Sequence, residues 1–581
     1  MKPPCFKSLK RRLTGFLAVL ALSFAAAGPL WAADSSQSVK AGVVERGLKQ
    51  PSAPLQPDRK IPLILPADKP EAELPADTGV RIQVSKFVFE GRSVLSETKI
   101  GKIAEPLLDK EVSFTDLALL CRKIEQFYKK KGYFLAQVYL PEQQVQTGEV
   151  HVRILEGRLG VLRIQGQKRT PEKFIRRFFR STEKRGVIHY GRLLRSILLL
   201  NENSSTHASV TFAPGKESGT TDLIVEIKED RPFNLYALFN NGGSDFVSKQ
   251  REGSQAQMKG LLFPGDKTTV SGIMGSPVAN LKYISGAYSA LLAPCGLLAD
   301  FAYNYSEFKS LRELRELGVR GKTQIFHTGL AQALWRSREL SVDAGIFFDY
   351  KQIQNFLLSQ RSSADELRVL GLNLNIDYAD PLRGRSSIAQ VLSSGIPHIM
   401  GGLDRNDPAA SRIGAGGGFV KYNVDAVRIQ KLPFSSFLIT KFMAQAASDV
   451  LPAAEEFSIG GIDTVRGFSQ GEHLGDEGYV VNLELRIPPP LITHRQIPYL
   501  NQDVKSTVQF AAFIDNGAVF RKAAASGETR SNTITGCGMG LRFFFPHDVN
   551  LSFDWGFPVS GNSSSTSAVS EFYLKLNARA L

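Results

Sequence analysis

The stretch LSVDAGIFFDY, Leu340 to Tyr350, alternates between apolar and polar residues. The even-numbered residues are apolar: Leu340, Val342, Ala344, Ile346, Phe348 and Tyr350. The odd-numbered residues are mainly polar and include Ser341, Asp343 and Asp349. Because successive side chains of a β-strand point to opposite faces of the sheet, this spacing predicts a strand with one apolar face and one charged face.

The same alternation returns throughout residues 231–581. Examples are LLADFAYNY (297–305), GLNLNIDYAD (371–380) and GYVVNLELRI (478–487). A soluble antiparallel sheet also alternates, but a sandwich of this length would have only one apolar layer per sheet. A transmembrane antiparallel β-barrel explains the pattern better, because its apolar residues face lipid and its polar residues face a wet lumen. About 16 strands fit, and so wide a barrel contains a channel unless something fills it.

The N-terminus predicts export. Basic residues precede the apolar run Leu13–Ala27, which is too short for a comfortable membrane-spanning helix. We therefore interpret residues 1–33 as a signal peptide cleaved near Ala32 or Ala33, with a signal anchor as the alternative. The sequence contains no second apolar run of helix-spanning length, so the mature chain either leaves the membrane or spans it as a barrel.

Between the signal peptide and the barrel, the sequence predicts a linker and two α+β modules. Residues 34–79 are polar and Pro-rich, and their start, Ser35–Lys49, has a weak helical signal. Residues 80–157 show a strand, an amphipathic helix in FTDLALLCRKIEQFYKKKGY (114–133) and two further strands. Residues 158–230 repeat that order, which indicates an internal duplication rather than two unrelated pieces.

Composition argues against catalysis and against nucleic-acid binding. The formal net charge is +15, but no compact Lys/Arg run lies beside aromatic residues in the mature part. Histidine is scarce, no phosphate loop or nucleophile elbow is present, and the cysteines lack metal-ligand spacing. We expect no catalytic residues, no metal and no cofactor. Cys121, Cys295 and Cys537 cannot all pair and are expected to be buried free thiols.

A glycine-rich loop, FSIGGIDTVRGFSQGEHLGDEGY (457–479), is a candidate for filling the lumen. Its tip carries Val465, Arg466, Gly467 and Phe468. In the later strand STVQFAAFIDNGAVF (506–520), Asp515 has the lumen-facing parity. An arginine on an in-folded loop can bind such a carboxylate through two parallel hydrogen bonds, which lysine cannot reproduce. The alternative is that Arg466 is a solvated residue of an external loop.

These segments resemble a known family. GGIDTVRGF followed by NLELRI resembles the signature loop of outer-membrane TpsB transporters of two-partner secretion, of the haemolysin activator and filamentous haemagglutinin transporter type. FIDNGAVF resembles the companion motif of that loop on a later strand. The two modules resemble POTRA domains, with GYFLAQVYLPEQQVQTGEVHVRILEGRLG (132–160) similar to the haemolysin-activator type. Residues 240–266 are similar to the first barrel hairpin of the family.

The resemblance implies a fold and partners that the spacing alone does not. It implies a 16-stranded barrel in the bacterial outer membrane, periplasmic POTRA domains and an in-folded loop around 457–478 whose arginine and acidic partner map onto Arg466 and Asp515. It also implies a lumen-plugging helix, for which Ser35–Lys49 is the candidate. The implied partners are a secreted exoprotein with an N-terminal secretion domain, of adhesin or haemolysin type, outer-membrane lipid and the barrel-assembly machinery. The chain ends in Leu581, where such barrels commonly end in Phe.

The sequence therefore predicts a protein-conducting pore without enzymatic activity. Strand edges of the modules are expected to catch an unfolded client by strand addition. Basic residues of the module helices are candidates for holding acidic client segments: Arg122, Lys123, Lys129, Arg176 and Arg177. Two alternatives stay open at this point. A barrel-assembly factor shares the loop motif but should have more POTRA modules, and a passive porin should have none.

Overall fold

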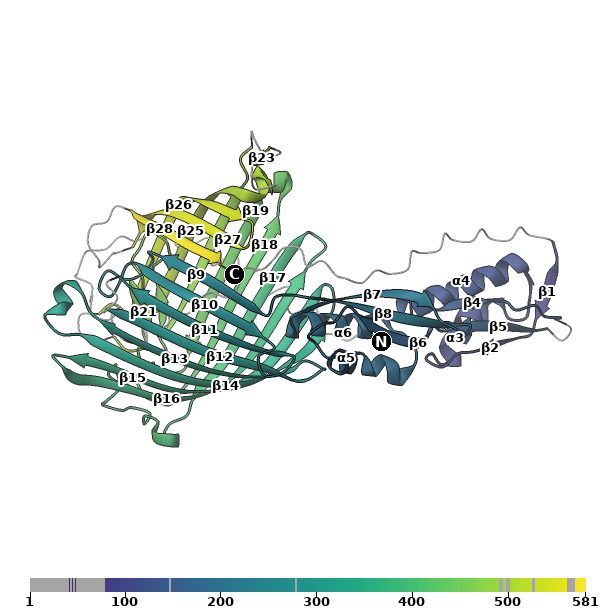
Figure 1. Cartoon of the computed structure of the whole chain (residues 1–581), viewed down its shortest axis with the longest axis horizontal. Coiled ribbons are helices and arrows are strands. Elements are labelled where there is room, and N and C mark those ends of the chain that lie inside the picture. The colour runs from purple at the N-terminus through teal and green to yellow at the C-terminus, as the bar shows by residue number, and fades with distance from the viewer. Residues whose placement is uncertain are drawn as a thin grey trace.

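The computed structural model has two α+β modules followed by a closed β-barrel, with the modules extending from one end of the barrel (Figure 1). It describes Ala41, Val44, Leu48 and residues 79–580 except 146–147, 277–279, 491–494, 498–501, 525–527 and 562–569. The predicted signal peptide and most of the predicted linker lie outside the described residues.

The first module contains two small sheets and two α-helices. Its strands and helices are β1 (Arg81–Val84), β2 (Lys86–Glu90), α3 (Glu97–Ala104), a 3₁₀ turn (Glu105–Leu107), β3 (Lys110–Ser113), α4 (Phe114–Lys130), β4 (Gln137–Tyr139) and β5 (Glu149–Leu155). Helix α4 begins at a capping box, in which Ser113 and Asp116 satisfy each other's backbone N–H groups. Its apolar stripe, including Leu120, Ile124 and Tyr128, is buried against the sheet β2–β5–β4.

The second module repeats the three-stranded sheet and the two helices of the first. It contains β6 (Arg158–Gln165), α5 (Glu172–Arg185), α6 (Tyr190–Asn203), β7 (Thr206–Pro214) and β8 (Thr220–Glu229). In its sheet, β6 pairs in parallel with β8, and β7 pairs antiparallel with β8. The strands β2, β5 and β4 of the first module have the same arrangement. This shared topology supports the interpretation of an internal duplication.

Sixteen antiparallel strands close the barrel, so the predicted fold class is confirmed. The strands are β9 (Phe233–Asn240), β10 (Arg251–Lys259), β11 (Asp266–Gly275), β12 (Leu281–Ala293), β13 (Leu297–Lys309), β14 (Arg320–Arg336), β15 (Leu340–Leu357), β16 (Gln360–Ala379), β17 (Gly384–Gly395), β18 (Phe419–Lys431), β19 (Phe437–Ala447), β22 (Glu477–Ile487), β25 (Val508–Phe520), β26 (Ser531–Phe545), β27 (Val549–Ser560) and β28 (Glu571–Arg579).

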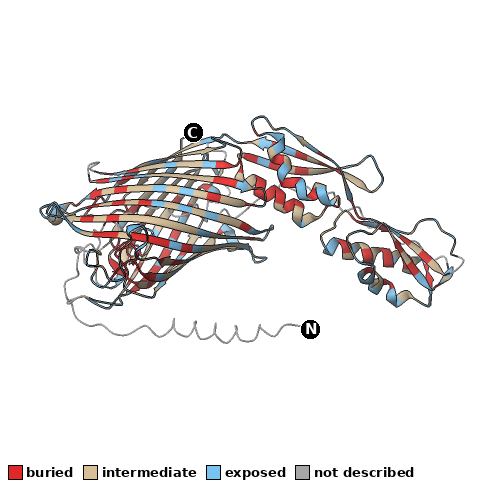
Figure 2. Cartoon of the chain, turned by 90° about the horizontal axis from the view of Figure 1, so that it is seen from below, coloured by how far each residue is buried: buried red, intermediate tan, exposed pale blue. Residues whose placement is uncertain are grey.

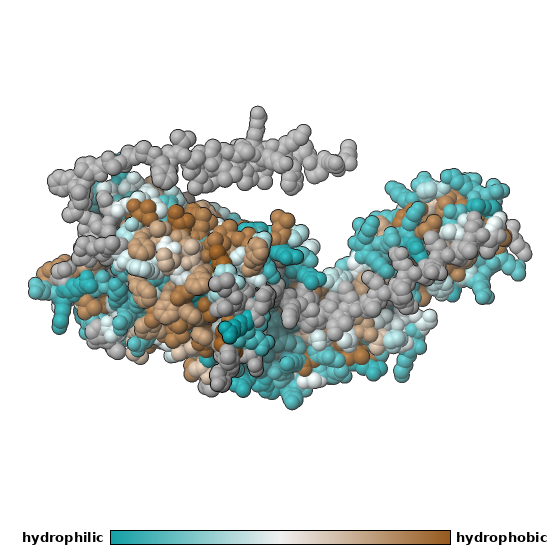
Figure 3. Space-filling model, turned by 90° about the horizontal axis from the view of Figure 1, so that it is seen from above, coloured by the Kyte–Doolittle hydropathy of each residue, from teal (hydrophilic) through white to brown (hydrophobic). Residues whose placement is uncertain are grey.

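The alternation of each strand separates the two faces of the wall. On β25, Phe510 and Ile514 are each 50% exposed on the outside, whereas Asp515 is fully buried on the inside. Figure 2 shows this alternation along the strands, and Figure 3 shows hydrophobic residues gathered on the barrel wall. No helix of the described part of the chain is long and apolar enough to cross a membrane.

The second module is packed directly on the rim of the barrel. Leu199 of α6 shares a hydrophobic core with Leu291 and Ala333 of the barrel strands. Arg195 donates hydrogen bonds to three carbonyl oxygens of the rim, those of Cys295, Ala333 and Leu334. A salt bridge of 2.8 Å between Arg336 and Glu202 joins the same two parts. These contacts fix the second module at one mouth of the barrel.

Three residues of the predicted linker region, Ala41, Val44 and Leu48, lie inside the barrel. Ala41 and Val44 are helical, and both are buried with Leu48 in one cluster with inward-facing wall residues such as Phe308 and Ile353. The backbone N–H of Ala41 donates to Oδ1 of Asn355 at 2.9 Å. The rest of the predicted plug helix Ser35–Lys49 lies outside the described residues.

The three cysteines of the described part are free thiols, as predicted, but only one of them is buried. Cys121 is buried in the first module, and that burial raises the pKa of its thiol to about 11. Cys295 is exposed on the barrel rim, and Cys537 is partly exposed on β26. The expectation of burial was wrong for Cys295 because it lies in the tight turn between β12 and β13, where no packed layer covers it.

Candidate functional site

The loop between β19 and β22 folds back into the lumen. It forms a short hairpin from β20 (Phe457–Ile459) and β21 (His473–Gly475), with the segment 460–472 as its tip. The turn at the tip requires glycine at Gly467, whose φ is 98°. A Cβ atom at Gly467 would lie 2.8 Å from the backbone of Phe557 on the wall, so no larger residue fits there.

Apolar contacts hold the tip on both sides of its arginine. Val465 and Phe468 are fully buried in a cluster with the loop residue Ile459 and with wall residues: Val480, Val519 and Ile534. Two wall glycines make room for the tip. A Cβ atom at Gly536 would lie 1.9 Å from the carbonyl oxygen of Arg466, and one at Gly556 would lie 2.7 Å from the nitrogen of Gly467.

The guanidinium of Arg466 binds the carboxylate of Asp515 through two parallel hydrogen bonds. Its Nε is 2.8 Å from Oδ2 and its Nη2 is 3.0 Å from Oδ1. The backbone N–H of Arg466 also donates to Oδ2. The guanidinium lies flat on the ring of Phe513, 3.5 Å from its centroid. Both charged side chains are buried, so the external-loop alternative for Arg466 does not hold.

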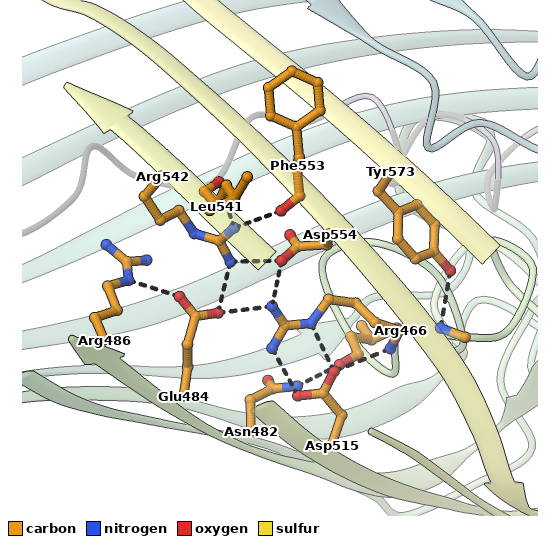
Figure 4. A network of polar contacts seen from close by, with 12 residues as sticks. Arg466, Asn482, Glu484, Arg486, Asp515, Leu541, Arg542, Phe553, Asp554 and Tyr573 are labelled. Carbon is orange, nitrogen blue, oxygen red and sulfur yellow. Dashed lines mark hydrogen bonds and ion pairs between the residues drawn. The ribbon is translucent and has the colours of Figure 1, made fainter. Parts of the chain in front are cut away.

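Four charged wall residues extend this pair into a network that the sequence reasoning missed (Figure 4). Glu484 accepts hydrogen bonds from Nη1 of Arg466 at 2.7 Å, from Arg542 at 3.0 Å and from Arg486 at 2.7 Å. Arg542 also donates to Asp554 at 2.7 Å. Three arginines and three carboxylates balance in charge. All of these groups except the partly exposed Arg486 are buried, so removal of a buried one leaves its partner uncompensated, at a cost of about 3–5 kcal/mol.

The tip also contacts the last strand, β28. The hydroxyl of Tyr573 accepts a hydrogen bond from the N–H of Gly467 at 3.1 Å and donates one to the carbonyl of Phe468 at 2.8 Å. Strand β28 pairs with β9 over five residue pairs, fewer than any other barrel ladder. The side chain of Asn241 prolongs that short seam by bonding to the backbone of Phe572 and Leu574. The loop tip therefore contacts a strand of the shortest ladder of the wall.

Tyr573→Phe should destabilise the folded barrel by about 1–3 kcal/mol, because the buried N–H of Gly467 would lose its acceptor. The measurement is the temperature at which the purified barrel loses its compact migration in a denaturing gel. Phe572→Ala, which changes an outward-facing neighbour on the same strand, is the control for general damage to β28. An unchanged transition temperature in Tyr573→Phe would show that the loop does not support the seam.

The basic residues predicted for client docking lie on the module helices, but not all of them are available. Lys123, Lys129 and Arg177 are exposed, and Arg122 is half-buried. Lys129 pairs with Glu125 of the same helix. Arg176 pairs with both Glu172 and Glu183, so its charge is already satisfied within α5. The structure gives the best access at Lys123 and Arg177.

Comparison with known proteins identifies the family. The family described as haemolysin secretion/activation protein ShlB/FhaC/HecB matches residues 219–543, which is more than half of the chain. The chain belongs to this family. A POTRA domain of ShlB type matches residues 82–157.

Relatives of the transporter cover most of its length. The chain is 24% identical to the heme/hemopexin transporter protein HuxB of Haemophilus influenzae over 67% of this chain and 69% of the relative. It is 22% identical to the outer membrane transporter CdiB of Escherichia coli, over 86% and 83% of the two chains. The solved structure of CdiB from Escherichia coli shares the fold, with a TM-score of 0.74, 20% identity, and coverage of 88% of this chain and 93% of that one.

These findings confirm the predicted family, function and location. The protein is an outer-membrane transporter of two-partner secretion, with its POTRA modules in the periplasm and its barrel in the membrane. The family consists of transporters. The comparisons support this function rather than the assembly-factor or passive-porin alternatives. The rim that carries the second module is therefore the periplasmic end of the barrel, and the turns at the opposite end face the exterior.

Proposed function

We propose that this transporter exports one large exoprotein of adhesin or haemolysin type, which it binds unfolded in the periplasm and threads through its lumen. The relatives named as hemolysin and heme/hemopexin transporters support that client class. The observation that supports a path from the modules into the lumen is the packing of the second module on the periplasmic rim through Arg195 and Leu199. A client held by the modules starts next to the lumen, and the proposed step involves no catalytic group or cofactor.

The client is proposed to bind by strand addition as well as by charge. Each POTRA sheet has two edge strands, β2 and β4 in the first module and β6 and β7 in the second. An extended client can pair with such an edge through its backbone, which needs no particular client sequence. Exposed Lys123 and Arg177 on the adjacent helices would then select acidic client segments.

The function is tested by co-expression in a secretion-deficient host. The transporter is paired with each candidate exoprotein that carries an N-terminal secretion domain, and the culture medium is assayed for the exoprotein. We expect one cognate client to appear outside the cell only when the transporter is present. Export of any unfolded periplasmic protein at the same rate would contradict a dedicated client.

We further propose that the predicted helix Ser35–Lys49, which contains the buried residues Ala41, Val44 and Leu48, closes the lumen at rest and leaves it before export. Ala41 is 1% exposed and faces Gly321, where an added Cβ atom would lie 2.7 Å from its own. No bulkier residue fits at this contact. The predicted helix Ser35–Lys49 would then act as the plug that the resemblance implies, with Ala41, Val44 and Leu48 as its described contacts.

Ala41→Trp should raise the ionic conductance of the pore to that of a chain lacking residues 34–49, because the indole cannot fit against Gly321. The measurement is current across planar bilayers that contain the purified protein. Gln144→Trp, at an exposed position of the first module, is the control for the added side chain. Conductance at the wild-type level in Ala41→Trp would argue against a plug at this position.

A further inference from the structure

A hollow of about 940 Å³ lies in the outer wall of the barrel, across strands β11 to β15. Most of its lining residues have the outward-facing parity, and several are aromatic. The main aromatic lining residues are Tyr288, Phe301, Tyr303, Phe326, Phe348 and Tyr350. Phe301 and Phe326 are about half exposed. The hollow is thus an apolar groove that opens toward the membrane.

The strand register explains why the wall is hollow there. Gly286 is opposite Val270 on one side and Tyr303 on the other, and the row continues through Phe326 and Tyr350. A glycine therefore interrupts a row of large side chains. Nothing lies within 4 Å of the position where a Cβ atom of Gly286 would be. The rings of Tyr303 and Phe326 pack at 4.7 Å and form a firm wall beside the gap.

On the β16 side, the groove is bordered by a short turn that a buried arginine holds in place. The short turn Ile399–Gly401 reaches over the outer face, and Met400 lines the hollow. Fully buried Arg368 of β16 donates to the carbonyl of Met400 at 2.5 Å. The guanidinium of Arg368 also lies 3.6 Å from the ring centroid of Tyr350. The turn is therefore tied to the aromatic wall.

Cations lie on the same outer face above the aromatic rows, toward the exterior. Lys282 and Lys322 occupy one row, with Glu307 between them. Lys309 and Arg320 form the next row outward. All four basic residues are at least partly exposed, and among the described residues none has a carboxylate within salt-bridge distance. Four cations outnumber the one carboxylate of these two rows, so the net charge of this patch is positive.

We propose that this groove binds lipopolysaccharide, with acyl chains against the aromatic rows and lipid A phosphates at the cationic rows. The cationic rows lie at the exterior ends of β12, β13 and β14, and lipopolysaccharide forms the outer leaflet at that level. Its phosphates suit the charge of Lys322 and Arg320, because cationic side chains attract anionic lipid headgroups at the membrane surface. The heights match, since apolar residues lie toward the membrane centre and the cations toward its exterior surface.

The test measures binding of purified lipopolysaccharide to the full chain in phosphatidylcholine nanodiscs. Arg320→Gln and Lys322→Gln should each weaken binding about five-fold. Gly286→Leu should also weaken it by filling the hollow, and Ala512→Leu, which adds the same bulk to the outer face of β25, should not. Glu307→Gln should tighten binding, because it removes a like charge from the phosphate site.

The Glu307→Gln variant is expected to bind lipopolysaccharide more tightly, whereas the other groove variants bind it less tightly. This difference separates the proposal from general damage to the barrel, since an unfolded variant cannot bind more tightly. Folding of each variant is checked by its compact migration in a denaturing gel. Equal affinity in all folded variants would overturn the proposal. Phosphatidylglycerol that binds as tightly as lipopolysaccharide, with the same dependence on Gly286, would overturn the choice of lipopolysaccharide.

Discussion

Arg466→Ala is expected to reduce export of the partner protein about a hundred-fold while the barrel still inserts into the outer membrane. The substitution leaves the buried carboxylates of Asp515 and Glu484 without their shared cation, at a cost of about 3 kcal/mol or more. The loop tip would then lose its fixed position against the inner face of the barrel wall. The measurement compares partner protein in the medium with folded transporter in the outer membrane. Normal export by Arg466→Ala would rule out a role in export for the paired hydrogen bonds between Arg466 and Asp515.

Asp515→Ala should give a similar defect, and the double variant should be no worse than the worse single variant. Two groups that act through one contact are not additive, whereas independent groups are. Arg466→Lys should be intermediate, because lysine keeps the charge and loses the planar fork. His327→Ala is a matched control, since His327 joins Asp300 and Asp349 on neighbouring wall strands and does not touch the loop. It should leave most of the export intact.

The sequence predicted the face on which each site residue lies, because alternation along a strand is a local property. It placed Asp515 and Glu484 on polar faces from their parity alone. It paired Asp515 with Arg466 because a carboxylate and an arginine were the obvious complement in the two recognised segments. The sequence signal for the wider network was present as Glu484 and Arg486 on one strand. The missing information was the order and register of β22, β25, β26 and β27, which lie side by side in the wall and bring these inward side chains together.

The contacts between the module and the rim could not be predicted in the same way. Arg195 binds backbone carbonyl oxygens, and every residue has one, so its partners leave no mark in the sequence. The docking prediction stays a prediction, and it too was made without knowledge of the partners of each side chain. Helical spacing marks a basic face but gives no weight to acids on the same helix, and Arg176 is held by two of them. The contact of Tyr573 with the loop could not be predicted either, because its partners are the backbone groups of Gly467 and Phe468.

Deletion of residues 80–157 is expected to stop export and to leave a folded pore that conducts ions. The first module has its own hydrophobic core, and its contacts with the core of the second module come from one short segment that contains Phe134 and Leu135. The second module stays on the rim through Arg195 and Leu199, which the deletion does not touch. The barrel wall is closed by its own ladders and contains no strand from the first module. Export is measured as partner protein in the medium, and pore formation as conductance in planar bilayers.

A matched variant separates client docking from a simple change of length. Lys123→Glu combined with Arg177→Glu keeps both modules and reverses two exposed charges on their helices. If acidic client segments bind there, this variant should export less, and the loss should shrink as the salt concentration rises, because salt screens exposed charges. If strand edges alone hold the client, the double variant should export normally and only the deletion should fail. Unchanged export in the deletion would remove the first module from the route, and the client would then have to bind at the second module on the rim.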